Sequence, residues 1–351
     1  METLGHRPAL DGLRALAIAA VVGYHAFFVP ADGWLGVDLF FVLSGFLITT
    51  LLLEEHDATG HVRIGAFYLR RAYRLLPAAL LMLAVVALAW AVTGRLTGSR
   101  AVVLAEALGY VMNLVLAGWF GHSTTAVSHL WSLALEEQFY LVWPALLFVV
   151  LRARRRVALV ALIVTAVLVA VNGAVRVQGD GHRALFAPDT RSVGILVGCA
   201  AAIALSLRPV TVHRVARFAW PPALAVAVAL TFEPYGLAMF GSRLLVFAVA
   251  IAILVVSGLH AGPATWVLSR APLTYLGRIS YSLYLWHVPI FVEFGIIGKP
   301  VFPAGSLPVR LVAIACSCLA AAASYHFVEN PIRRRSRRAR AQPRAALVAA
   351  P

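Results

Sequence analysis

Ten apolar runs, each close to the length of a membrane-spanning helix, constrain the fold of this 351-residue chain more than any other feature. A helix needs roughly 20 mostly apolar residues to cross the hydrocarbon core of a bilayer. Hydrophobic residues make up 61% of the chain and charged residues only 13%, which excludes a disordered chain and argues against an ordinary soluble domain. The sequence therefore predicts an all-α, polytopic integral membrane protein with about ten transmembrane helices in the lipid bilayer. The predicted spans are residues 11–29, 35–53, 75–93, 131–151, 157–172, 191–207, 217–231, 243–260, 276–297 and 309–328.

An eleventh run, 101–120, differs from these spans because Glu106, Asn113 and Gly118 interrupt it. The positive-inside rule assigns loops rich in Lys and Arg to the cytoplasm. If 101–120 does not cross, most of the 30 Lys and Arg residues fall on the cytoplasmic side, whereas a crossing would put the Arg-rich loop after 151 and the C-terminal tail outside. We therefore expect 101–120 to form an interfacial or re-entrant helix, and both termini to be cytoplasmic.

The net charge of +15 raises the question of a nucleic-acid partner. In a chain this apolar, the Arg residues belong to loops that flank the membrane, so no nucleic acid is expected. No stretch outside the apolar runs is long enough for a second core, which predicts one membrane domain over 1–332 and a basic, disordered cytoplasmic tail over 333–351. The three cysteines lie in apolar runs without the spacing of zinc ligands, and no metal is expected.

A few ionisable residues lie inside the predicted spans, where they are costly and therefore mark candidate functional sites. Arg14 and His25 share a face of the first span, with Arg14 about 16 Å nearer the cytoplasm. Asp38 lies near the outer end of the second span, close to His25, and we expect its carboxylate to orient the histidine. Glu136 lies at a similar depth in the fourth span. These four residues are the predicted catalytic set.

Arg71 and Arg74 are three residues apart in the inner segment 67–77, so on a helix they share a face. Two guanidinium groups on one face can bind phosphate groups through paired hydrogen bonds. The alternative is that both residues only serve the positive-inside rule.

The segment 280–287 adds three further candidates, Ser282, Tyr284 and His287. Small residues at helix contacts and an aromatic belt at the membrane surface are the simpler explanation of this segment. His287 lies deeper than such a belt requires, and the sequence shows no partner for it.

Taken together, six segments resemble the acyltransferase-3 family of bacterial membrane O-acyltransferases. Each segment alone is a weak signal, but they occur in order through nearly the whole chain. The segments are residues 10–14 with His25, 36–48, 67–77, 131–144, 280–289 and 328–331.

This resemblance implies an acyl-CoA donor, with acetyl-CoA expected, on the cytoplasmic side of a bacterial inner (cell) membrane. It also implies that the acceptor is a hydroxyl group of a cell-envelope glycan or glycolipid. By the same resemblance, the important positions are Arg14, His25, Arg71, Arg74 and Glu136. Members of the family often carry a C-terminal esterase-like domain, which this sequence lacks. We therefore expect a stand-alone transferase, or one that passes its acyl group to a separate periplasmic or extracellular partner.

The resulting hypothesis is that Arg71 and Arg74 hold the phosphates of coenzyme A while His25 acts as a general base or accepts the acyl group itself. Within this hypothesis, Glu136 or Arg14 stabilises charge in the transition state. A macrolide or another secondary metabolite stays open as the acceptor. A transporter or flippase of a lipid-linked glycan is the competing class, although it would require polar residues along a path through both leaflets. A non-catalytic membrane scaffold is the third class.

Overall fold

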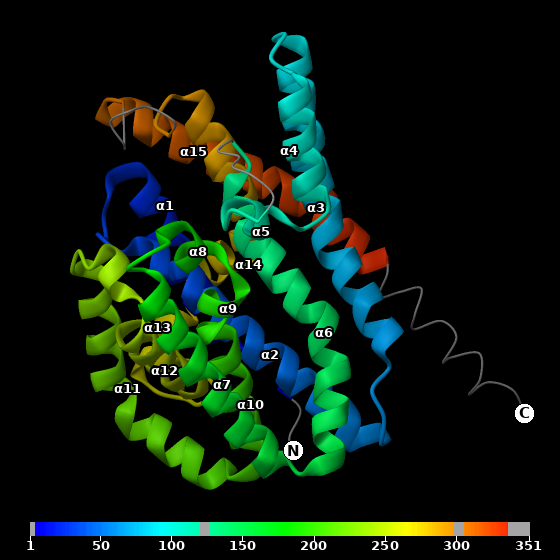
Figure 1. Cartoon of the computed structure of the whole chain (residues 1–351), viewed down its shortest axis with the longest axis vertical. Helices are drawn as coiled ribbons and strands as arrows, with labels where there is room; N and C mark the ends of the chain where they lie inside the picture. Colours follow the sequence, from blue (N-terminus) through cyan, green and yellow to red (C-terminus); the bar gives the residue numbers. More distant parts are fainter. Residues whose placement is uncertain (1–3, 120–125, 298–304, 336–351) are drawn as a thin grey trace, which may run out of the picture.

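A computed structural model describes residues 4–119, 126–297 and 305–335 of the chain, and within these residues it contains helices and no strands. Each of the ten predicted spans coincides with one long helix (Figure 1). The long helices are α1 (Pro8–Phe27), α2 (Gly36–Thr59), α3 (Ile64–Val92), α6 (Trp131–Ala153), α7 (Arg155–Arg176), α10 (Val193–Leu207), α11 (Pro209–Phe232), α12 (Ser242–Ser257), α14 (Ala271–Glu293) and α15 (Leu307–Ser324).

Short helical segments connect the long ones. These are α4 (Gly98–Leu108), α5 (Met112–Leu116), α8 (Gly181–Phe186), α9 (Pro188–Arg191) and α13 (Pro263–Leu268), with 3₁₀ turns at Gly33–Leu35, Ser128–Leu130 and Gly236–Met239. A π-helical segment, Tyr325–Glu329, follows α15 directly. π-Helical turns of this kind are frequent at functional sites.

Six helices are long and apolar enough to cross a membrane: α1, α2 with the turn before it, α3, α7, α11, and α15 with the segment that follows it. The helices α10 and α12 are equally apolar but shorter, with 15 and 16 residues. The helices α6 and α14 have 23 residues each and carry more polar side chains. The prediction of an all-α, polytopic membrane protein is therefore confirmed.

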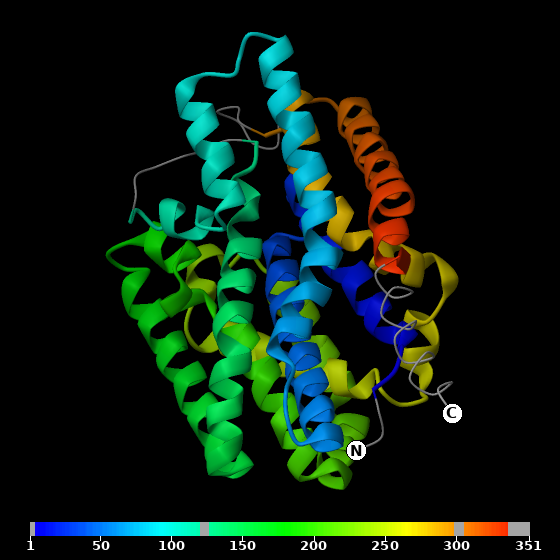
Figure 2. The same cartoon turned by 90° about the vertical axis from the view of Figure 1, so that its right-hand side faces the viewer.

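The run 101–120 forms two short helices instead of one span. α4 ends before Gly109, and Tyr110 has a positive φ of 52°, which breaks the helix before α5 begins. The 11 residues of α4 extend only about 16 Å, roughly half the thickness of the hydrocarbon core. Neither helix is long enough to cross, although Phe120 and the residues up to 125 lie outside the described part of the chain. Together α3 and α4 extend beyond the rest of the bundle at one end (Figure 2).

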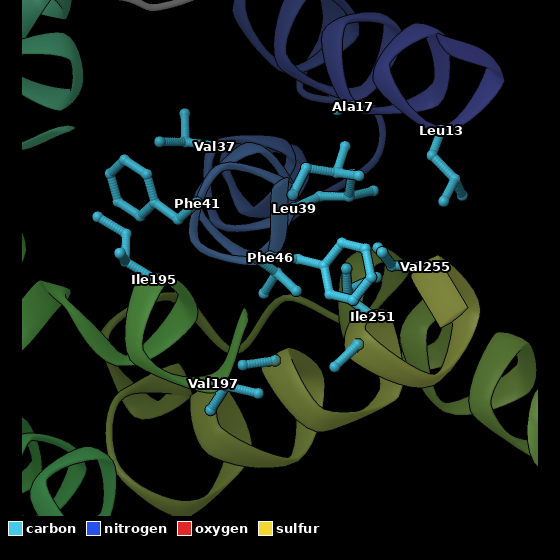
Figure 3. Close-up of a cluster of buried hydrophobic side chains, with 14 of the residues drawn as sticks. Leu13, Ala17, Val37, Leu39, Phe41, Phe46, Ile195, Val197, Ile251 and Val255 are labelled. Carbon is cyan, nitrogen blue, oxygen red and sulfur yellow. The ribbon is translucent and has the colours of Figure 1, made fainter. Parts of the chain in front are cut away.

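The main core forms where α1, α2, α10 and α12 meet (Figure 3). Phe46 on α2 is fully buried among side chains of α10 and α12, including Ile251 and Val255. A second cluster joins α3, α4, α5 and α14 through Met82, Val103, Met112 and Leu285. These two clusters hold in place the helices whose polar residues form the candidate site.

Glycines allow α2 and α10 to approach closely. A side chain on Gly198 would overlap the backbone carbonyl of Val42, and one on Gly45 would overlap that of Ile195. Small residues at such positions are typical of contacts between membrane helices. We expect Gly198→Ala to lower the free energy of unfolding by about 1 to 3 kcal/mol, because the added methyl group must push the backbones apart.

Reversible unfolding in mixed detergent measures this effect. The matched control is Gly65→Ala at the start of α3, where an added methyl group meets no atom within 4 Å. That variant should keep its stability or gain about 0.5 to 1 kcal/mol from the better helix former. Equal stabilities for the two variants would contradict the close contact of α2 with α10.

Candidate active site

A cavity of about 530 Å³ opens between α1, α2, α3, α6, α14 and the π-helical segment. Its lining is more basic than acidic, which makes the cavity attractive to an anionic ligand. The charged residues of the lining are six arginines, Arg7, Arg14, Arg71, Arg74, Arg278 and Arg333, and three acids, Asp11, Glu136 and Glu329.

Arg14 lies on the cavity wall and is held by its own helix. Its guanidinium group donates a hydrogen bond of 2.8 Å to the buried carboxylate of Asp11, one turn earlier on α1. The other oxygen of Asp11 lies 2.9 Å from Nε2 of His6. Asp11 thus orients Arg14 while the guanidinium still faces the cavity.

Arg71 and Arg74 both reach the cavity from the first turns of α3, as the shared face predicts. The guanidinium group of Arg71 lies over the ring of Tyr140, 3.2 Å from its centroid, and 3.7 Å from a carboxylate oxygen of Glu137. Arg74 has no hydrogen bond or ion pair with any residue in the described part of the chain. Arg71 is therefore fixed in place, whereas the charge of Arg74 is available to a ligand.

Glu136 lines the same cavity from α6. Its carboxylate accepts a hydrogen bond of 2.8 Å from Ser44, which joins α6 to α2. Ser132 lies one turn earlier on the same face of α6 and also lines the cavity.

At the Ser132 end of the cavity, Tyr284 connects the lining to a cluster of histidines. The Tyr284 hydroxyl lies 2.7 Å from the Ser132 hydroxyl and 2.8 Å from the carbonyl oxygen of His129. One turn further along α14, Nε2 of His287 lies 3.3 Å from Nδ1 of His25. The rings of His129 and His287 are 5.5 Å apart. His25 and His287 thus lie just beyond the residues that line the cavity.

The expected contact between Asp38 and His25 is wrong, because the structure gives this carboxylate another partner. Arg191 donates a hydrogen bond of 2.9 Å to Asp38, and both side chains are almost completely buried. The rings of Trp34, Trp131 and Phe240 surround the guanidinium group at 5.0 to 5.4 Å. Asp38 therefore joins α2 to the end of α9, just before α10, and its position does not support a role as the group that orients His25.

Three ionisable residues in or beside the site were not among the candidates from the sequence. Arg191 is the first residue of the predicted span 191–207, His129 lies in the polar stretch before α6, and Glu329 follows the last predicted span. In the structure, Glu329 accepts a hydrogen bond from Ser282 and lines the cavity. A search for ionisable residues within one turn of each span end would have found all three.

A buried ion pair depends strongly on both partners, because removal of one leaves the other charge uncompensated. We expect Asp38→Asn to lower the free energy of unfolding by about 3 to 5 kcal/mol. The matched control is Glu293→Gln, which removes the acid of an exposed pair with Arg95 at the same distance of 2.9 Å. That variant should change stability by about 0 to 1 kcal/mol. Reversible unfolding in mixed detergent measures both, and a small effect of Asp38→Asn would show that the buried pair does not hold α2 to α9.

Within residues 4–119, 126–297 and 305–335, no three His, Cys, Asp or Glu side chains come together as ligands for a metal ion.

Comparison with known proteins gives consistent matches. The sequence model described as "Acyltransferase domain" of the acyltransferase-3 family matches residues 7–326. The "Putative peptidoglycan O-acetyltransferase YrhL" of Bacillus subtilis (strain 168) is 35% identical over 366 residues, which cover 95% of this chain and 56% of that protein. The "O-acetyltransferase OatA" of Staphylococcus aureus (strain NCTC 8325 / PS 47) is 30% identical over 378 residues, covering 93% of this chain and 57% of OatA.

This chain spans a little over half of the length of these two relatives. No solved structure matches the chain. The match to the family over residues 7–326 covers nearly the whole chain and all of the α-helices that form the cavity, which are α1, α2, α3, α6 and α14. The chain therefore belongs to the acyltransferase-3 family.

Proposed function

We propose that the chain transfers an acyl group from acyl-CoA to a hydroxyl group of a cell-envelope glycan or glycolipid. The acyl group that we expect is acetyl. The observation that carries this proposal is the basic cavity that ends at Tyr284 and Ser132, with the His25–His287 pair directly behind it. Two features of an acyl transfer, a place for an anionic donor and a base near its end, thus lie next to each other.

The arginines of the cavity suit the phosphate groups of coenzyme A. Arg binds phosphate through two parallel hydrogen bonds, and Arg74 has its donors available. Arg71, held by Tyr140 and Glu137, offers a fixed positive charge beside it. Arg14 lies about 16 Å along α1 from His25, which supports a role in holding the donor more than a role at the reacting carbonyl.

At the reacting carbonyl, His25 has two chemically balanced routes. As a general base it removes the proton of the acceptor hydroxyl, the oxygen attacks the thioester carbon, and the imidazolium returns the proton to the leaving thiolate. As a nucleophile it attacks the thioester itself, releases the thiol of coenzyme A, and passes the acyl group from its ring to the acceptor hydroxyl. Both routes end in an oxygen ester and free coenzyme A.

The positive-inside rule supports a cytoplasmic location for both termini, and with them for the donor end of the cavity. The N-terminal residues 4–7 and Arg333 both line this end of the cavity. His25 lies at the far end of α1, toward the outer face. Acyl-CoA would then enter from the cytoplasm of a bacterial cell, and the acceptor from the outer side of the cell membrane. The family likeness also supports a separate extracytoplasmic partner as the receiver of the acyl group.

Purified protein in lipid nanodiscs, incubated with radiolabelled acetyl-CoA and a peptidoglycan fragment, tests the proposal. The name of the Bacillus relative makes peptidoglycan the first acceptor to try. The expected product is a base-labile ester that carries the label on the glycan. A macrolide and a lipid-linked glycan serve as parallel acceptors.

Lack of label on all of these acceptors, with folded protein present, would overturn the transferase proposal. Movement of a fluorescent lipid-linked glycan across vesicles without acyl transfer would favour the flippase.

A further inference from the structure

His287 is completely buried, and its hydrogen bonds fix where its proton lies. Its Nδ1 atom is 2.7 Å from the carbonyl oxygen of Tyr284 and 3.1 Å from that of Leu283. Carbonyl oxygens only accept hydrogen bonds, so Nδ1 carries the proton. In the neutral imidazole, Nε2 of His287 then carries a lone pair.

This lone pair faces His25. Nε2 of His287 is 3.3 Å from Nδ1 of His25, and two lone pairs at that distance would repel each other. The hydrogen bond therefore requires the proton of neutral His25 on Nδ1, which leaves the reactive lone pair of His25 on Nε2. The two backbone carbonyls of α14 thereby favour one tautomer of a histidine on α1, whose ring also has a backbone hydrogen bond to Val21 of its own helix.

We propose that His287 is the positioning residue that holds His25 in the tautomer with its lone pair on Nε2. This proposal rests on the proposed function, in which Nε2 of His25 is the base or the acyl acceptor. A carboxylate has this orienting task in serine hydrolases. Here Asp38 is occupied by Arg191, and a neutral histidine supplies orientation without adding a buried negative charge, which would be costly in the membrane.

Two variants separate the hydrogen bond from the packing. In His287→Gln, the amide oxygen can reach the position of Nε2 and accept from Nδ1 of His25. In His287→Phe, the ring fills the space without an acceptor. We expect the Phe variant to lower kcat about a hundredfold to ten-thousandfold with an unchanged KM for acetyl-CoA, and the Gln variant to keep kcat within about tenfold of the natural protein.

Nitrogen NMR of the protein labelled with ¹⁵N-histidine reads the tautomer without any activity measurement. The signals of His25 are assigned by their loss in His25→Ala. Nδ1 of His25 should appear as a protonated nitrogen and Nε2 as an unprotonated one, in the natural protein and in His287→Gln. In His287→Phe, the two nitrogens should exchange between the protonated and unprotonated forms.

His129→Phe is the matched control. His129 is buried beside His287, but its Nε2 lies 3.2 Å from the carbonyl oxygen of Leu285. Its replacement should leave the tautomer of His25 unchanged.

The proposal is overturned if His25 carries its proton on Nε2, if His287→Phe leaves both tautomer and kcat unchanged, or if His287→Gln is as inactive as His287→Phe. Failure of the proposed function gives a different result, namely no acyl transfer by the natural protein. The nitrogen spectra decide the tautomer in that case too.

Discussion

Replacing His25 with alanine is expected to lower the rate of acyl transfer by about a hundredfold to ten-thousandfold without unfolding the protein. The imidazole is the group that removes the acceptor proton or carries the acyl group, and the two histidines beside it are held by backbone carbonyls. His287 has its Nδ1 on backbone carbonyls, and His129 lies against a carbonyl of α14. The single-turnover rate with labelled acetyl-CoA and peptidoglycan fragment measures the loss.

The control for this variant is His61→Ala. His61 is exposed, and its ring lies 2.8 Å from the carbonyl oxygen of Thr59, away from the cavity, so its loss should leave transfer unchanged. Transfer at the natural rate by normally inserted His25→Ala would contradict the mechanism. Incubation with labelled acetyl-CoA in the absence of acceptor also separates the two routes. Label that becomes bound to the natural protein but not to His25→Ala indicates an acyl-histidine. If the natural protein acquires no label without acceptor but transfers the acyl group when acceptor is added, transfer is direct.

The double variant Arg71→Ala with Arg74→Ala is expected to weaken binding of coenzyme A by at least about a hundredfold. Each charge-assisted hydrogen bond contributes about 1.5 to 3 kcal/mol, and 1.4 kcal/mol corresponds to a factor of ten. Isothermal titration with coenzyme A measures the change. The affinity of the natural protein should also fall with increasing salt, because the ligand is held by charge.

The matched control removes the same charge from the same part of the chain. Arg63 and Arg70 precede Arg71 and both pair with Glu55, away from the cavity. The double variant Arg63→Ala with Arg70→Ala should therefore bind coenzyme A as the natural protein does. If both double variants bind equally well, Arg71 and Arg74 serve the positive-inside rule and do not bind the donor.

The positions of the helices could be predicted because hydropathy is a local property of the sequence. All ten apolar runs became helices, and the ends that moved did so for visible reasons. α3 begins at Ile64 instead of 75, since its first turns carry the arginines that the hydropathy window excludes. α11 begins at Pro209 instead of 217 for the same reason, with Arg214 and Arg217 in its first turns.

The site was predicted less completely, because its contacts join helices far apart in the sequence. Arg14, Arg71, Arg74, Glu136 and Tyr284 do meet at one cavity. The partner of His25 is 262 residues away, and the partner of Asp38 is 153 residues away. No spacing rule along one helix reveals such pairs. Asp38 was matched with His25 only because the two lie on neighbouring spans, while Arg191 begins a predicted span much further along the chain.

The length of α10 affects how the protein responds to its lipid environment. Its 15 residues extend about 22 Å, clearly less than the roughly 30 Å of the hydrocarbon core. α10 packs against α2, α7 and α12 and is mostly buried, so protein rather than lipid surrounds it. Hydrophobic mismatch therefore acts on the lipid-exposed α7 and α11, with 22 and 24 residues, and not on α10. The Asp38–Arg191 pair, at the end of α9 and directly before α10, is thus insulated from changes in bilayer thickness that would tilt the outer helices.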